Sequence, residues 1–140
     1  MSEIRIDRTL AAPPERVWHA STDPAALARW FWPASMNTSV IVDLRPGGTL
    51  RIEAPGRMAV QGEYTAIDPP HLLAFTWRWD GDPTGTAVRL ELSPVDDGTR
   101  LVLVHHGFPD QQAQADHRTG WSDCLARLPG YLAEAEVRRR

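Results

Sequence analysis

The feature that most constrains this fold is a series of short alternating segments that fills the chain between residues 39 and 106. Alternation of apolar and polar residues is the period of a strand with one buried face. Gaps as short as 45–48 and 96–98 admit hairpins but no crossover helix, so consecutive strands are expected to pair antiparallel. The six predicted strands occupy residues 39–44, 49–54, 60–67, 72–79, 87–92 and 101–106.

The flanking segments complete the order of elements. Residues 3–10 alternate in the same way and predict a first strand. Pro13 or Pro14 suits the first turn of a short helix, Asp23 before a proline is the N-cap signal of a second, and Asp110 is placed to cap a third. Helical spacing in the last third is kept by Trp121, Cys124, Leu125, Leu128, Tyr131 and Leu132. We expect an α+β fold, in which a curved seven-stranded antiparallel sheet wraps a long C-terminal helix.

Composition narrows the function classes. A chain of 140 residues predicts one domain, residues 1–140. The net charge of −3 gives no electrostatic footprint for nucleic acid, and no apolar run approaches the ~20 residues of a membrane span. The N-terminus lacks the apolar segment of a signal peptide, and the single Cys124 fits a reducing cytosol. We therefore expect a cytoplasmic protein without nucleic-acid or membrane partners.

Four stretches resemble the signatures of one large family: RTLAAPPERVWHASTDPAALARWFWP, DLRPGG, AIDPPHLLAFTW and HHGFPDQQAQADHRTGW. It is the bacterial single-domain family named after the activator of the heat-shock protein 90 ATPase, within the START/SRPBCC superfamily. The resemblance runs from about residue 4 to residue 132. It implies a helix-grip (START/Bet v-like) fold, with a cavity between the sheet and the last helix. Its members range from lipid and hormone carriers to polyketide cyclases, so the resemblance implies no single activity.

Alternation assigns side chains to the implied cavity. Phe75, Trp77 and Trp79 share one face of their strand, and His105 continues the inward face of the last strand. Aromatic walls with a few polar groups are typical of small-molecule sites, although a packed aromatic core explains the same pattern. The predicted ligand-binding residues are Trp32, Met36, Phe75, Trp77, Trp79, His105, Phe108, Trp121, Leu125 and Leu128.

The two adjacent histidines of the last strand have competing interpretations. Neighbouring strand residues point to opposite faces, so His105 and His106 are not expected to grip one metal ion, and we predict neither a metal site nor a cofactor. His105 is either a hydrogen-bonded core histidine or a polar anchor or proton donor for a ligand. His106 is expected on the outer face. His117 is expected to face solvent or to clamp the preceding loop.

No catalytic motif emerges from the sequence. It contains no nucleophile elbow, phosphate loop or dinucleotide fingerprint, and Cys124 is interpreted as a small core residue. The strand carboxylates alternate outward, with Glu63 dependent on whether a bulge at Gly62 reverses its face.

The predicted function is binding of a small hydrophobic or aromatic molecule in the internal cavity. A cyclase- or hydrolase-like enzyme using the same cavity, a chaperone-cofactor or protein-interaction module, and a filled core without a ligand remain alternatives. The edge strands and the loop 80–85 leave a homodimer open.

Overall fold

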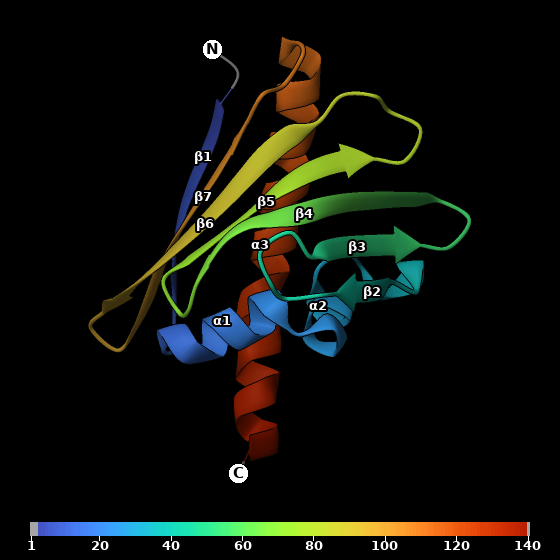
Figure 1. Ribbon diagram of the computed structural model, residues 1–140. Helices are drawn as coiled ribbons and strands as arrows, with labels where there is room; N and C mark the ends of the chain where they lie inside the picture. The colour runs from blue at the N-terminus through green and yellow to red at the C-terminus, as the bar shows by residue number, and fades with distance from the viewer. Residues whose placement is uncertain (1–2, 140) are drawn as a thin grey trace.

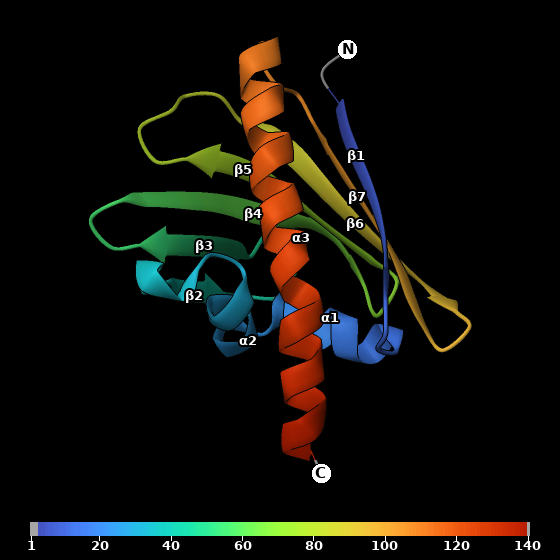
Figure 2. The same cartoon turned by 180° about the vertical axis from the view of Figure 1, so that it is seen from behind.

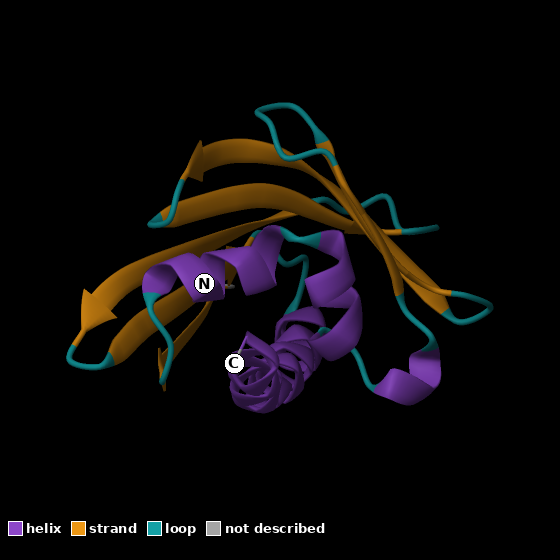
Figure 3. Cartoon of the chain, turned by 90° about the horizontal axis from the view of Figure 1, so that it is seen from below, coloured by secondary structure: helices purple, strands orange, loops and turns teal. Residues whose placement is uncertain are grey.

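A seven-stranded antiparallel sheet curves around one long helix in the computed structural model, which describes residues 3–139 (Figures 1 and 3). The strands are β1 (Glu3–Leu10), β2 (Ser39–Val42), β3 (Thr49–Ala54), β4 (Met58–Asp68), β5 (Leu72–Trp79), β6 (Thr86–Val95) and β7 (Gly98–His106). The helices are α1 (Pro14–Thr22), α2 (Pro24–Trp30), the 3₁₀ turn η1 (Ala34–Met36) and α3 (Gln111–Arg139). The predicted α+β fold class and order of elements are confirmed.

The strand order is β1-β7-β6-β5-β4-β3-β2, so every strand from β2 to β7 pairs with its neighbour in sequence. The first strand closes the series by pairing with the last, from Glu3 opposite His106 to Leu10 opposite Thr99. Since β1 and β2 lie at opposite edges, α1 and α2 carry the chain from one edge to the other, contacting β6, β7 and β2 on the way. Figure 2 shows α3 crossing the face of the sheet that these short helices also cover.

The helices begin where the sequence predicts. Asp23 Oδ2 accepts a hydrogen bond from the amide of Ala26 at 2.9 Å, and Asp110 Oδ1 accepts one from the amide of Ala113 at 2.8 Å. Both are N-cap contacts that satisfy amides without helical partners. Pro129 lies inside α3 without ending it. No helix within residues 3–139 is long and apolar enough to cross a membrane.

A bulge in β4 contributes to the curvature. The register between β4 and β5 shifts between Tyr64 and Ala66, which lies after Gly62, the position at which the sequence analysis considered a bulge. Glu63 therefore stays exposed on the outer face. Gly62 has a different role, because a Cβ there would collide with the backbone carbonyl of Thr76 on β5. A bulge bends its strand and increases the local twist, which helps the sheet to wrap α3.

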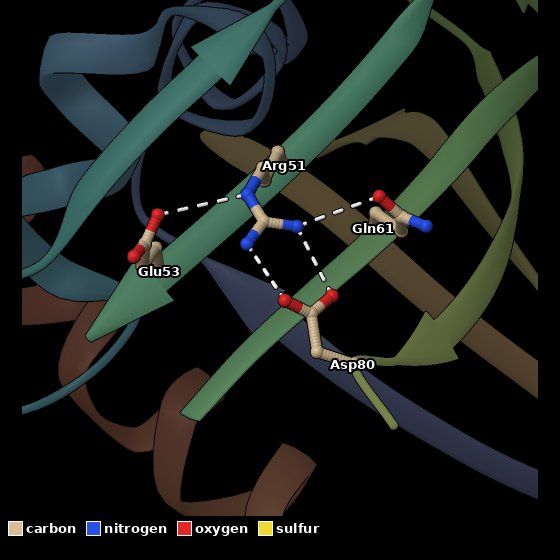
Figure 4. A network of polar contacts seen from close by, with 4 residues as sticks. All are labelled: Arg51, Glu53, Gln61 and Asp80. Carbon is tan, nitrogen blue, oxygen red and sulfur yellow. Dashed lines mark hydrogen bonds and ion pairs between the residues drawn. The ribbon is translucent and has the colours of Figure 1, made fainter. Parts of the chain in front are cut away.

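A polar network on the outer face holds the end of β5 against β3 (Figure 4). The Arg51 guanidinium donates two hydrogen bonds to the Asp80 carboxylate, at 3.0 and 2.7 Å, and a longer one of 3.4 Å to Gln61. Glu53 lies 3.6 Å from Arg51 Nε. The guanidinium lowers the pKa of Asp80, mainly through these hydrogen bonds. The network holds Asp80 in place, directly after Trp79, and Trp79 borders the pocket described below.

Candidate ligand-binding pocket

A pocket of about 560 Å³ lies between the end of β5, the segment after α2 and the first half of α3. Its lining residues are Phe31, Trp32, Pro33, Met36, Met58, Trp77, Trp79, Asp116, His117, Gly120, Trp121, Asp123, Cys124 and Arg127. The exposed members of this set are Pro33, Asp116, Gly120 and Asp123, so the mouth lies between α3 and the segment after α2.

Aromatic rings in mutual contact form the buried wall. Trp32 and Trp79 are stacked, with ring centroids 6.2 Å apart and planes 11° from parallel. Trp77 stands edge-on to Trp79 at 5.6 Å and contacts Trp121 at 5.2 Å. Phe31 meets Trp121 edge-on at 5.6 Å. Such offset and edge-to-face contacts stabilise each other beyond the area they bury, so the wall is a connected unit.

Two indole–imidazole hydrogen bonds cross between the sheet and α3. Trp121 on α3 donates from Nε1 to His105 Nδ1 on β7 at 2.9 Å, and Trp79 on β5 donates from Nε1 to His117 Nε2 on α3 at 2.8 Å. An indole nitrogen only donates, so each accepting imidazole nitrogen carries no proton. His117 therefore holds its proton on Nδ1, which donates to the carbonyl of Ala113 at 2.7 Å.

His105 uses both ring nitrogens inside the core. With Nδ1 accepting from Trp121, its proton lies on Nε2 and is donated to Thr86 Oγ1 at 2.6 Å. The Thr86 hydroxyl in turn donates to the carbonyl of Trp77 at 3.1 Å. Burial lowers the pKa of His105 to about 3, with smaller contributions from His117 and His106. The geometry is that of a neutral, hydrogen-bonded core histidine.

The segment that carries Phe31 and Trp32 is clamped by α3. Arg127 donates from Nε to the carbonyl of Trp30 at 3.0 Å and from Nη2 to the carbonyl of Phe31 at 2.7 Å. The Cys124 thiol donates to the same Phe31 oxygen at 2.8 Å. These donors satisfy carbonyls left free at the C-terminus of α2. Burial raises the pKa of Cys124 to about 12, so this thiol stays protonated as the hydrogen bond requires.

Charge is confined to the mouth of the pocket. The carboxylates of Asp116 and Asp123 are exposed there, and the Arg127 guanidinium is half-buried beside them with Nε and Nη2 occupied. No group of three Cys, His, Asp or Glu side chains within residues 3–139 is arranged to hold a metal ion.

The structure distributes the residues predicted for the cavity over three places. Those that border the pocket are Trp32, Met36, Trp77, Trp79 and Trp121. Phe75 and Leu125 instead border a deeper void of about 30 Å³, shared with Trp77 and Trp121. His105, Phe108 and Leu128 border neither space. Most of the concave face is therefore filled by side chains, and the open volume lies at one end of it. Whether any of these residues binds a ligand stays a prediction.

Several lining residues were not anticipated from the sequence. His117 was expected to face solvent or to clamp the preceding loop. Its ring contacts Phe108 of that loop at 4.9 Å between centroids, and it also accepts a hydrogen bond from Trp79, which the sequence did not predict. Gly120 and Cys124 flank Trp121 on α3, and Arg127 lies one further turn along. Gly120, Cys124 and Arg127 follow one another four and three residues apart, which places them on one face of the helix and was a usable signal. Met58 carried none, because it follows a turn at the very start of its strand.

Together, the fold and the pocket define an α+β helix-grip domain, in which a curved sheet and a long C-terminal helix leave an aromatic pocket at one end. The chain belongs to the family described as Activator of Hsp90 ATPase homolog 1-like protein, whose model matches residues 11–133. This confirms the resemblance seen in the sequence. None of the curated proteins compared with the chain matches it.

Solved structures agree with this assignment. Protein CV1439 from Chromobacterium violaceum is 33% identical, with 94% of this chain and 96% of that chain covered and a TM-score of 0.84. CalU16 from Micromonospora echinospora is 30% identical, with coverage of 97% and 79% and a TM-score of 0.75. PFC0360w, an HSP90 activator from Plasmodium falciparum, is 23% identical with coverage of 95% and 97% and a TM-score of 0.81, a likeness of fold alone.

Proposed function

We propose that this protein binds one small, flat and largely apolar molecule in the pocket beside α3. The observation that carries the proposal is the connected wall of Phe31 and four tryptophans around about 560 Å³ of open volume. Pockets of roughly 300–1,000 Å³ with aromatic walls and few polar groups are the usual form of small-molecule sites. Flat rings suit such a wall, because they can stack on indoles without reorganising them.

The wall is also held in place without a ligand. The hydrogen bonds of Trp79 and Trp121 to histidines fix two indoles, and the Arg127 clamp fixes the backbone at Phe31. A site ordered in advance loses less conformational freedom on binding, which favours affinity for a small ligand.

Two exposed glycines of α3 offer a matched test. Gly120 lines the mouth of the pocket and Gly130 does not, and a Cβ at either position meets nothing within 4 Å. Gly120→Leu places an apolar side chain at the mouth, whereas Gly130→Leu is the control for adding the same group to the helix. Both changes replace a helical glycine, so neither is expected to destabilise the fold.

Binding of 2-ethylnaphthalene is measured by isothermal titration calorimetry and native mass spectrometry. We expect one molecule per chain for the wild type and for Gly130→Leu, and binding at least about tenfold weaker for Gly120→Leu. Absence of binding to naphthalene-sized probes in the wild type, or equal binding by the two variants, contradicts the proposal. Absence of binding returns attention to the alternatives of a filled core or a protein partner.

A further inference from the structure

One indole in the pocket wall has a buried N–H without a hydrogen-bond partner. Trp77 is only 4% exposed, and its Nε1 is buried without a partner among the described residues. Trp30 donates to the carbonyl of Ala20 at 3.0 Å, and Trp79 and Trp121 donate to histidines. Buried polar groups in folded proteins are nearly always paired, so this N–H requires an explanation.

The side chain of Trp77 borders two spaces, although its Nε1 atom is itself closed to solvent. These spaces are the open pocket and the deeper void of about 30 Å³. Phe31 and Trp121 also border both spaces, so these three rings form a partition between them. The three rings all contact one another, with Trp77 6.2 Å from Phe31 and 5.2 Å from Trp121, and Phe31 5.6 Å from Trp121 between ring centroids.

The pocket itself supplies no acceptor for this donor. Its buried lining side chains are aromatic rings and the Cys124 thiol, which already donates to the carbonyl of Phe31. The carboxylates of Asp116 and Asp123 lie at the exposed mouth, where they disfavour an anionic ligand. The nearby cation, Arg127, holds backbone carbonyls through Nε and Nη2.

We propose that the ligand carries a neutral carbonyl oxygen on its flat ring system, as in an aromatic ketone or quinone, and that Trp77 Nε1 donates the hydrogen bond that holds it. This inference rests on the proposed function and adds the chemical class of the ligand. A site built to pair a polar group discriminates strongly against an analogue that lacks the group.

The competing explanation is a single water in the deeper void. Tyr64 borders that void, and its hydroxyl is the other buried group there without a partner. A volume of about 30 Å³ holds one water, which needs two or more polar contacts. A water bridging Tyr64 and Trp77 would leave the ligand no role in pairing the indole, so the test must separate the two.

Three probes of nearly equal size separate these explanations: 2-acetylnaphthalene, 2-ethylnaphthalene and 2-naphthoate. We expect the ketone to bind about tenfold more tightly than the hydrocarbon, the effect of one neutral hydrogen bond, and the carboxylate to bind most weakly. In ¹H–¹⁵N spectra, assigned through contacts to neighbouring rings, the Trp77 indole proton should move downfield with the ketone and not with the hydrocarbon.

Trp77→Phe and Trp121→Phe provide the matched variants. Trp77→Phe should bind ketone and hydrocarbon equally, whereas Trp121→Phe should bind both less tightly and keep the ketone preference. Equal wild-type affinities, or a Trp77 indole proton unmoved by the ketone, overturn the inference while leaving the proposed function intact. If none of the three probes binds, the proposed function fails and the inference with it. The wild-type spectra decide the question even if Trp77→Phe does not fold.

Discussion

The buried His105 makes the stability of the fold depend on pH in a way that can be worked out from the structure. An unfolded histidine has a pKa near 6.5, whereas burial lowers the pKa of His105 in the folded chain to about 3. Between these values the unfolded state binds a proton that the folded state does not. The free energy of unfolding therefore falls as the pH drops from about 6.5 towards 3, and this contribution is constant below 3.

The magnitude follows from the width of that window. Each pH unit inside it costs about 1.4 kcal/mol, so lowering the pH from 7 to 5 removes about 2 kcal/mol through His105 alone. A domain of this size is stable by only about 5–15 kcal/mol, so the loss is large. The carboxyls of Asp7 and Asp80 do not confuse the measurement, because arginine partners hold each pKa below 3.8.

Urea denaturation at pH 5, 6 and 7 measures the effect. His105→Gln keeps an amide able to donate to Thr86 and accept from Trp121 but cannot titrate, so its free energy of unfolding should lose the slope. His106→Gln is the matched control, because the neighbouring side chain is exposed on the same strand. A His105→Gln variant with the wild-type slope would refute the buried, neutral assignment of His105.

Three other substitutions test the contacts of the wall and of the outer face. Arg127→Met should cost about 1–3 kcal/mol in urea denaturation, because it leaves the Trp30 carbonyl unpaired and the Phe31 carbonyl with the Cys124 thiol alone, and a loss below about 0.5 kcal/mol would contradict the clamp. Trp121→Phe should destabilise the fold by about 1–3 kcal/mol more than Trp77→Phe, because only Trp121→Phe leaves a buried acceptor, His105 Nδ1, without its donor. Equal losses would mean that the N–H of Trp77 is also paired. Asp80→Asn removes the exposed partner of Arg51, so hydrogen exchange should quicken in the loop 80–85 while the melting temperature barely changes; a fall in melting temperature as large as that of Arg127→Met would be inconsistent with a local role.

Much of the fold was predictable because local rules determine it. Alternation and turn residues located the strands, and three of them match the predicted bounds: β1 (Glu3–Leu10), β3 (Thr49–Ala54) and β5 (Leu72–Trp79). The caps at Asp23 and Asp110 are short-range contacts that a sequence displays directly. Strand ends such as that of β6, which continues to Val95, were less predictable, since pairing with β7 extends it beyond its alternating part.

The candidate site was predictable only in part, because it depends on contacts between residues far apart in the chain. The tryptophans were noticed for their bulk, yet Trp79 pairs with His117 across 38 positions, and Arg127 reaches Phe31 across 96. Alternation predicted that His105 points inward, but it did not indicate whether the side chain lies in the packed core or on the pocket. That distinction depends on how the Trp121 indole and Thr86 enclose the imidazole, which a pattern along one strand does not contain.

The most direct test of ligand binding is native mass spectrometry of the protein purified from the organism that encodes it, followed by denaturing extraction. The account predicts one small aromatic molecule per chain, lost from Gly120→Leu and retained by Gly130→Leu. It is contradicted if wild-type protein has the mass of the bare chain and its tryptophan fluorescence does not respond to a panel of flat apolar molecules.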